Sequence, residues 1–88
     1  MEYNKAGEIT RYYNLDDILK LNLSDTFKEE IKKKLHRKVY YDNHGTCKVG
    51  TLIGIERNNK LLETYYIVDI DGDKNFVPIY KSITRIVD

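Results

Sequence analysis

The stretch TYYIVDIDGDKNFVPI, residues 64–79, decides the fold. Two apolar runs flank an Asp-Gly dipeptide (71–72), and this arrangement is a strong signal for a tight β-hairpin. A two-residue loop pairs Ile70 with Asp73, whereas a four-residue loop pairs Ile70 with Asn75. Because both registers keep the same side chains on the same face, the two faces of the hairpin follow from the sequence in either case.

The alternating residues Asp69, Asp71 and Asp73 also resemble the first ligands of an EF-hand calcium loop. Such a loop requires glycine at its sixth position and glutamate at its twelfth. Counted from Asp69, these positions hold Lys74 and Tyr80, and the flanking runs are strand-like rather than helical. We therefore interpret the segment as a turn and expect no metal there.

Both faces of the predicted hairpin carry apolar residues. Strand alternation places one set on a first face, which we assign to the core: Tyr66, Val68, Ile70, Val77 and Ile79. The opposite face holds a second set, with Asp69 and Lys74 near the tip: Tyr65, Ile67, Phe76 and Pro78. A sheet with one face in water alternates apolar with polar residues, so this second face needs a cover. We expect helices to supply it, with an external ligand or protein as the alternative.

Residues 14–36 are predicted to be helical. Asn14 is a suitable N-cap for a first short helix. Three consecutive residues are competent caps for a second: Ser24, Asp25 and Thr26. Thr26 with Glu29 three residues later forms the pattern of a capping box.

An apolar stripe follows this second helix at steps of four: Phe27, Ile31 and Leu35. Two i,i+4 ion pairs, Glu29–Lys33 and Glu30–Lys34, stand in the favoured order. Two short helices with a brief connection predict an α-hairpin that packs on the strands.

After Lys38 the hydrophobic period changes from four to two, which predicts five short strands. They are KVYYD (38–42), CKVGTLIGIE (47–56), TYYIVDI (64–70), NFVPI (75–79) and TRIV (84–87), with turns at DNHG (42–45) and RNNK (57–60) and a single tight turn at YKSI (80–83). This pattern, over residues 37–88, resembles an SH3-like small β-barrel, whose members run through five short strands with a 3₁₀-like turn before the last. The resemblance implies binding of peptides, nucleic acids, modified tails or subunits, and seldom catalysis.

The predicted fold is therefore α+β, an N-terminal α-hairpin packed on a five-stranded antiparallel SH3-like small β-barrel. We expect a single domain over residues 1–88, in which 1–13 are a candidate mobile arm, 14–36 the helical part and 37–88 the barrel. The chain is 41% hydrophobic and 33% charged, which is the composition of a folded protein. It has a single cysteine, no apolar run of membrane-spanning length and no signal-peptide pattern, so we expect a cytoplasmic protein.

Tyrosine is unusually frequent, at eight residues of 88, and six of them form doublets. A doublet in a strand sends one ring to each face, so we expect Tyr40 and Tyr65 to point outward and, with Phe76, to be candidate partner contacts. Outward rings suit a protein interface or base stacking, although tyrosine also simply suits strands.

A local basic cluster lies in residues 28–38, with Lys32, Lys33, Arg37 and Lys38 as candidate partner contacts. Such a cluster can contact a phosphate backbone. The alternative is a solvated face whose cations suit a helix C-terminus.

Catalytic and metal motifs are not evident in the sequence. His36, His44 and Cys47 could be offered as ligands, or as a base and nucleophile, but a zinc site normally needs three or four protein ligands. We interpret them as a turn histidine and a small buried cysteine, and we expect no enzyme, cofactor or small-molecule substrate.

The sequence thus predicts a small interaction module that binds a protein partner through exposed tyrosines. The alternative is a nucleic-acid-binding module that uses the basic helix 28–38 and outward tyrosines. A weaker compositional association, with a chain rich in Lys, Asn, Ile and Tyr, is with phage or mobile-element products that inhibit a host nuclease.

Overall fold

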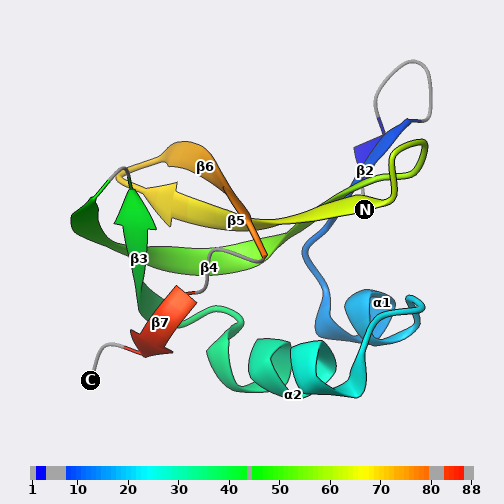
Figure 1. The fold of residues 1–88 in the computed structure, drawn as a ribbon, viewed down its shortest axis with the longest axis horizontal. Coiled ribbons are helices and arrows are strands. Elements are labelled where there is room, and N and C mark those ends of the chain that lie inside the picture. The colour runs from blue at the N-terminus through cyan, green and yellow to red at the C-terminus, as the bar shows by residue number, and fades with distance from the viewer. Residues whose placement is uncertain (1, 4–7, 44, 80–82, 87–88) are drawn as a thin grey trace.

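A computed structural model describes residues 2–3, 8–43, 45–79 and 83–86 (Figure 1). Its two helices are α1 (Leu15–Leu19) and α2 (Asp25–Lys34). Its strands are β1 (Glu2–Tyr3), β2 (Ile9–Tyr12), β3 (Lys38–Asn43), β4 (Thr46–Asn58), β5 (Glu63–Ile70), β6 (Asp73–Pro78) and β7 (Ile83–Ile86). These strands form one antiparallel sheet, of which five curl into a half-barrel compatible with a small barrel.

The five strands expected from the alternation pattern are all present, as β3 to β7, with ends within two residues of those predicted. The tight turn predicted at YKSI falls mainly on residues 80–82, which lie outside the described residues. Neither helix has the length and apolarity needed to cross a bilayer, within the part of the chain that the structure describes.

β4 is the central strand of the sheet, because it pairs with three other strands. Its first half pairs with β3 and its last four residues pair with β2, while β5 lies along its other side. β2 belongs to the segment assigned to a candidate mobile arm, for which no regular structure was predicted. Residues 9–12 are instead paired in register with residues 58–55.

The Asp-Gly hairpin has the tighter of the two predicted registers. Ile70 pairs with Asp73, so the loop contains two residues. Asp71 and Gly72 both have positive φ, at 50° and 91°. Positive φ at both loop positions is the type I′ turn that the right-handed twist of paired strands favours. The prediction of a turn is confirmed.

The face of β4–β6 that carries Ile55, Tyr66, Val68 and Val77, here called the inner face, forms the core with both helices. Ile18 and Ile31 are fully buried against it. The ring of Phe27 stacks on that of Tyr66, with centroids 5.6 Å apart. Figure 1 shows both helices on one side of the β4–β5 ribbon.

The prediction that the helices cover the second face of the hairpin is therefore wrong. That face, here called the outer face, carries Tyr65, Ile67 and Phe76 and is partly covered by residues 11–13. Gly54, the register partner of Ile67, lies against the carbonyl of Tyr12 and the ring of Tyr13. Ile67 is fully buried as a result.

The helix starts are set by single polar side chains. Asn14 Oδ1 accepts a hydrogen bond from the amide of Asp16 at 2.8 Å, as predicted. α2 is capped by Ser24, whose Oγ accepts from the amide of Phe27 at 3.1 Å. The predicted capping box is wrong, because Thr26 already lies inside the helix.

The ion pairs along α2 follow the prediction in part. Glu30 pairs with Lys34 at 2.8 Å, as expected. Glu29 pairs with Lys32 at 3.1 Å instead of with Lys33, so this contact spans three residues rather than four. In both pairs a glutamate in the middle of α2 contacts a lysine of its last turn.

Candidate protein interface and an adjoining pocket

The outer face contains a groove of about 340 Å³ between β2 and the β5–β6 hairpin. Strand register brings its residues together, because Arg11 pairs with Glu56, Glu56 with Tyr65, and Ile67 with Phe76. Alternate positions of adjacent strands share a face, so these side chains project from the same side of the sheet. Phe76 is 40% exposed there, which is unusual for a phenylalanine in a strand.

Arg11 holds the edge of this groove. Its guanidinium carbon lies 4.9 Å from the centroid of the Phe76 ring, within the range of a cation–π contact. Its Nε also lies 4.0 Å from a carboxylate oxygen of Glu56. The ring of Phe76 is therefore in contact with one cation while much of the residue stays open to solvent.

Lys74 and Tyr13 make a second contact of this kind nearer the hairpin tip. The Lys74 ammonium lies 5.2 Å from the ring centroid of Tyr13 and donates a hydrogen bond to its hydroxyl at 3.2 Å. These cation–ring contacts add to the pairing of β2 with β4 in holding the N-terminal segment on the outer face.

The predicted outward rings occupy two separate places. Tyr65 and Phe76 line the outer-face groove together. Tyr40 is half-buried on β3, where it pairs with Val49. Val49 lies seven residues along β4 from Glu56, the partner of Tyr65, which is on the order of 20 Å of extended strand.

The basic residues lie apart from the Tyr65 and Phe76 rings. Lys32 and Lys33 are exposed on α2, which packs on the inner face. Arg37 and Lys38 are exposed where the chain leaves the helix and enters β3. The helical lysines and the two groove rings therefore lie on opposite sides of the sheet.

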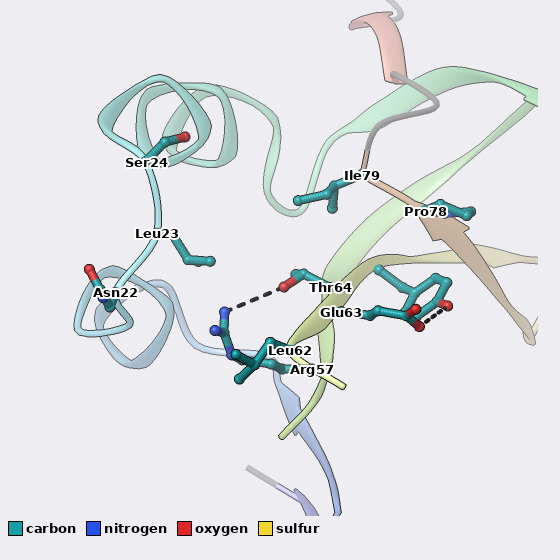
Figure 2. Close-up of a pocket in the computed structure, with 10 residues that line it drawn as sticks. Asn22, Leu23, Ser24, Arg57, Leu62, Glu63, Thr64, Pro78 and Ile79 are labelled. Carbon is teal, nitrogen blue, oxygen red and sulfur yellow. Dashed lines mark hydrogen bonds between the residues drawn. The ribbon is translucent and has the colours of Figure 1, made fainter. Parts of the chain in front are cut away.

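A larger pocket, of about 460 Å³, lies between the connection of the two helices and the paired ends of β4 and β5 (Figure 2). Here the inner face changes from apolar to polar, because Arg57 and Thr64 follow Ile55 and Tyr66 on the same side. Arg57 is half-buried, and its Nη1 donates a long hydrogen bond of 3.4 Å to Thr64 Oγ1. Tyr65 lines both this pocket and the outer-face groove, so the two adjoin.

The rim of the pocket is formed by the tip of the β4–β5 hairpin. Asn58 Oδ1 accepts hydrogen bonds from the amides of Lys60 and Leu61 at 3.0 and 2.9 Å, which orders the turn. Leu61 and Leu62 are 61% and 69% exposed. Leu62 also has a left-handed backbone, with φ of 57°.

Among the described residues, three groups have pKa values shifted from the ordinary ones. A hydrogen bond from Lys34, together with its charge, lowers the pKa of Glu30. Burial raises the pKa of Tyr41. Burial, and then the negative charge of Glu30, raise the pKa of Tyr66. All three groups lie away from the groove and the pocket.

Two of the three candidate ligands singled out in the sequence, His36 and Cys47, lie among the described residues. Cys47 is exposed, which corrects the expectation of a buried thiol. His36 is also exposed, and His44 lies outside the described residues. No group of three or more metal-ligating side chains is found in the part of the chain that the structure describes.

Comparisons of the chain with protein-family models, with curated proteins and with solved structures gave no match.

Sequence reasoning identified Tyr65 and Phe76 but missed Arg11, Arg57 and Leu62. Arg11 belongs to a strand with no clear apolar period, so its place over Phe76 depends on long-range pairing. Arg57 was assigned to a turn, although it continues β4. The signal that was available for Leu62 is the pair of leucines beside a polar turn, since large apolar residues are rare in exposed loops.

Proposed function

We propose that this protein is a non-enzymatic interaction module that binds a protein partner through the outer face, with Phe76 and Tyr65 as the central contacts. The observation that carries the proposal is a 40% exposed phenylalanine that lines a groove and contacts Arg11 through its ring. Aromatic side chains have only two rotatable bonds, so they lose little conformational entropy on binding, and aromatic residues are frequent at interfaces.

The charges around the groove favour a protein over a nucleic acid. Glu56 and Glu63 line it beside Arg11, so both signs of charge surround the rings. Two carboxylates next to a stacking ring repel phosphates, whereas a protein surface can match a mixed pattern. On α2, Glu29 and Glu30 also pair with two of the lysines that the nucleic-acid alternative needs.

We infer in addition that residues 37–88 form an SH3-like small β-barrel beside an N-terminal α-hairpin. The strand order supports this inference, because β3 pairs with both β4 and β7 while β4, β5 and β6 form a meander. We also propose a cytoplasmic location and, as the partner, a host nuclease. Both proposals rest on the composition of the chain.

Quantitative affinity capture tests the function. Partners should be recovered with the wild-type chain and lost with Phe76→Ser. They should be retained with the control Val49→Ser, because Val49 is also an exposed apolar strand residue, at 44%, but lies outside the groove. Equal recovery with both variants would contradict the proposed interface.

The nucleic-acid alternative has its own measurement. Binding of a labelled single-stranded oligonucleotide should be weak and should not depend on Phe76 or Tyr65. Affinity that falls steeply with salt, and that Lys32→Ala or Arg37→Ala reduces, would instead favour the basic segment as the binding surface.

A further inference from the structure

We propose that the pocket around Arg57, hereafter the Arg57 pocket, binds a carboxylate of the partner together with an adjacent apolar side chain. This inference rests on the proposed function, since it takes the ligand to be a protein. It adds a second contact region and states the chemistry of the partner segment, an acidic residue next to an aliphatic one.

The first reason is the unmet hydrogen-bonding capacity of Arg57. A guanidinium has five N–H donors, and the hydrogen bond to Thr64 is a long one. Among the described residues no carboxylate forms an ion pair with Arg57. Glu63 also lines the pocket, and its Oε2 accepts a hydrogen bond from the Tyr65 hydroxyl at 2.9 Å rather than one from Arg57. A half-buried guanidinium in this state matches a carboxylate, which forms short, charge-assisted hydrogen bonds with it.

The second reason is the apolar wall beside that cation. Leu23, from the connection between the helices, and Ile79, after β6, both line the pocket and pack against the core. Figure 2 shows their side chains pointing toward the space beside Arg57 and Thr64. An aliphatic side chain placed next to the carboxylate would therefore meet fixed apolar surface.

The third reason is the conformation of Leu62 on the rim. Its left-handed backbone is unfavourable for a residue with a side chain, and its side chain is 69% exposed. Asparagine or glycine at this position would avoid both costs. Strained residues that persist often mark binding sites, and here the strain presents an apolar group at the mouth of the pocket.

Three N-acetylated peptides serve as probes: acetyl-Leu-Glu-Leu-amide, acetyl-Leu-Gln-Leu-amide and acetyl-Leu-Gln-Leu with a free C-terminus. Each is titrated into the full chain and followed by NMR at the Arg57 side chain and at the amides of Leu23 and Thr64. At least one carboxylate probe should bind roughly tenfold more tightly than the uncharged one, the effect of about one charge-assisted hydrogen bond. Comparison of the two acids shows whether a side chain or a chain terminus is preferred.

Matched variants assign the effect. Arg57→Gln should abolish the preference for the carboxylate, whereas Arg37→Gln, an identical change at an exposed site outside the pocket, should preserve it. Leu62→Asn should weaken all three probes without lowering thermal stability, because asparagine tolerates the left-handed backbone. Leu61→Asn is its control, since Leu61 is similarly exposed but does not line the pocket.

Two results would overturn the proposal. One is the absence of saturable shifts up to about 10 mM probe, which excludes even weak binding. The other is a preference for carboxylate that Arg57→Gln and Arg37→Gln reduce equally. Failure of the outer face as an interface is a separate outcome, because it appears as unchanged capture by Phe76→Ser and leaves the peptide titrations unaffected.

Discussion

Gly54 on β4 lies against the backbone carbonyl of Tyr12, with no space for a β-carbon between them. The contact lies where the chain leaves β2 and passes over the outer face toward α1. Tyr13 approaches the same glycine with its ring. A residue without a side chain at this position therefore lets the N-terminal segment lie directly on the sheet.

Gly54→Ala is expected to destabilise the protein by about 2 kcal/mol, the scale of an overpacked contact that must be relieved by backbone movement. Alanine is otherwise preferred to glycine within a strand, so any loss isolates the clash. Chemical denaturation measures the change, and amide hydrogen exchange in β2 locates it. A variant as stable as the wild type, with β2 equally protected, would refute this account of the contact.

Tyr66 makes stability depend on alkaline pH. Its pKa is raised in the folded protein, first by burial and then by Glu30, above the ordinary value of 10.0. The folded state therefore favours the neutral phenol. This contribution is fully present below pH 10 and is lost as pH rises through the folded pKa, because the unfolded chain ionises first.

Tyr66→Phe should consequently lose less stability than the wild type between about pH 9 and pH 11.5. The decline should not disappear, because burial raises the pKa of Tyr41 as well. Urea midpoints measured across this range test the prediction. Identical slopes for the two proteins would show that Tyr66 has the same pKa in the folded and unfolded states.

Tyr41 is 2% exposed, and its hydroxyl has no hydrogen-bond partner among the described residues. Because an unpaired buried hydroxyl is costly, Tyr41→Phe should leave the free energy of unfolding unchanged or raise it by about 1 kcal/mol. Thr10→Val is the matched opposite case. Thr10 is equally buried, but its Oγ1 accepts a hydrogen bond from Asn59 at 2.9 Å.

Thr10→Val should therefore cost about 1 kcal/mol, since it removes the hydrogen bond that the side-chain Nδ2 of Asn59 donates to Thr10. Thermal or urea denaturation of both variants provides the comparison. If Tyr41→Phe were the more damaging of the two, the hydroxyl of Tyr41 would have to be satisfied in solution.

The start of α2 distinguishes two caps that the sequence alone does not. Ser24→Ala should destabilise the protein by about 1 kcal/mol, because its Oγ satisfies the amide of Phe27. Thr26→Ala should be neutral or slightly stabilising, since Thr26 occupies a helical position where alanine is preferred. The reverse order in a denaturation experiment would restore the capping box that Thr26 and Glu29 suggested.

The sequence predicted well those elements that depend on residues close together in the chain. Alternation and an Asp-Gly turn are sufficient to place Tyr66 and Val77 on one face and Phe76 on the other. The cover of the outer face was not predictable in this way. It depends on β2, a four-residue strand whose partner on β4 is remote in sequence, and on cation–ring contacts such as Arg11 with Phe76 that leave no apolar period.

In the candidate site, too, some residues follow from local sequence and others from long-range pairing. Tyr65 and Phe76 follow from strand alternation, whereas the pocket beside them arises from register. Arg57 enters it because the ends of β4 and β5 stay paired, and Leu62 because the turn between them adopts a left-handed residue. Neither property is visible in local composition.

Two strands, β2 and β3, pair with the same side of β4, and this arrangement implies an order of folding. β3, β4, β5 and β6 follow each other through short connections, so this meander can close with little loss of chain entropy. β2 reaches the same strand only after closing a loop that includes both helices and β3. We therefore expect β2 to join last, which makes the side of the molecule that bears Phe76 the final surface to be completed as the chain folds.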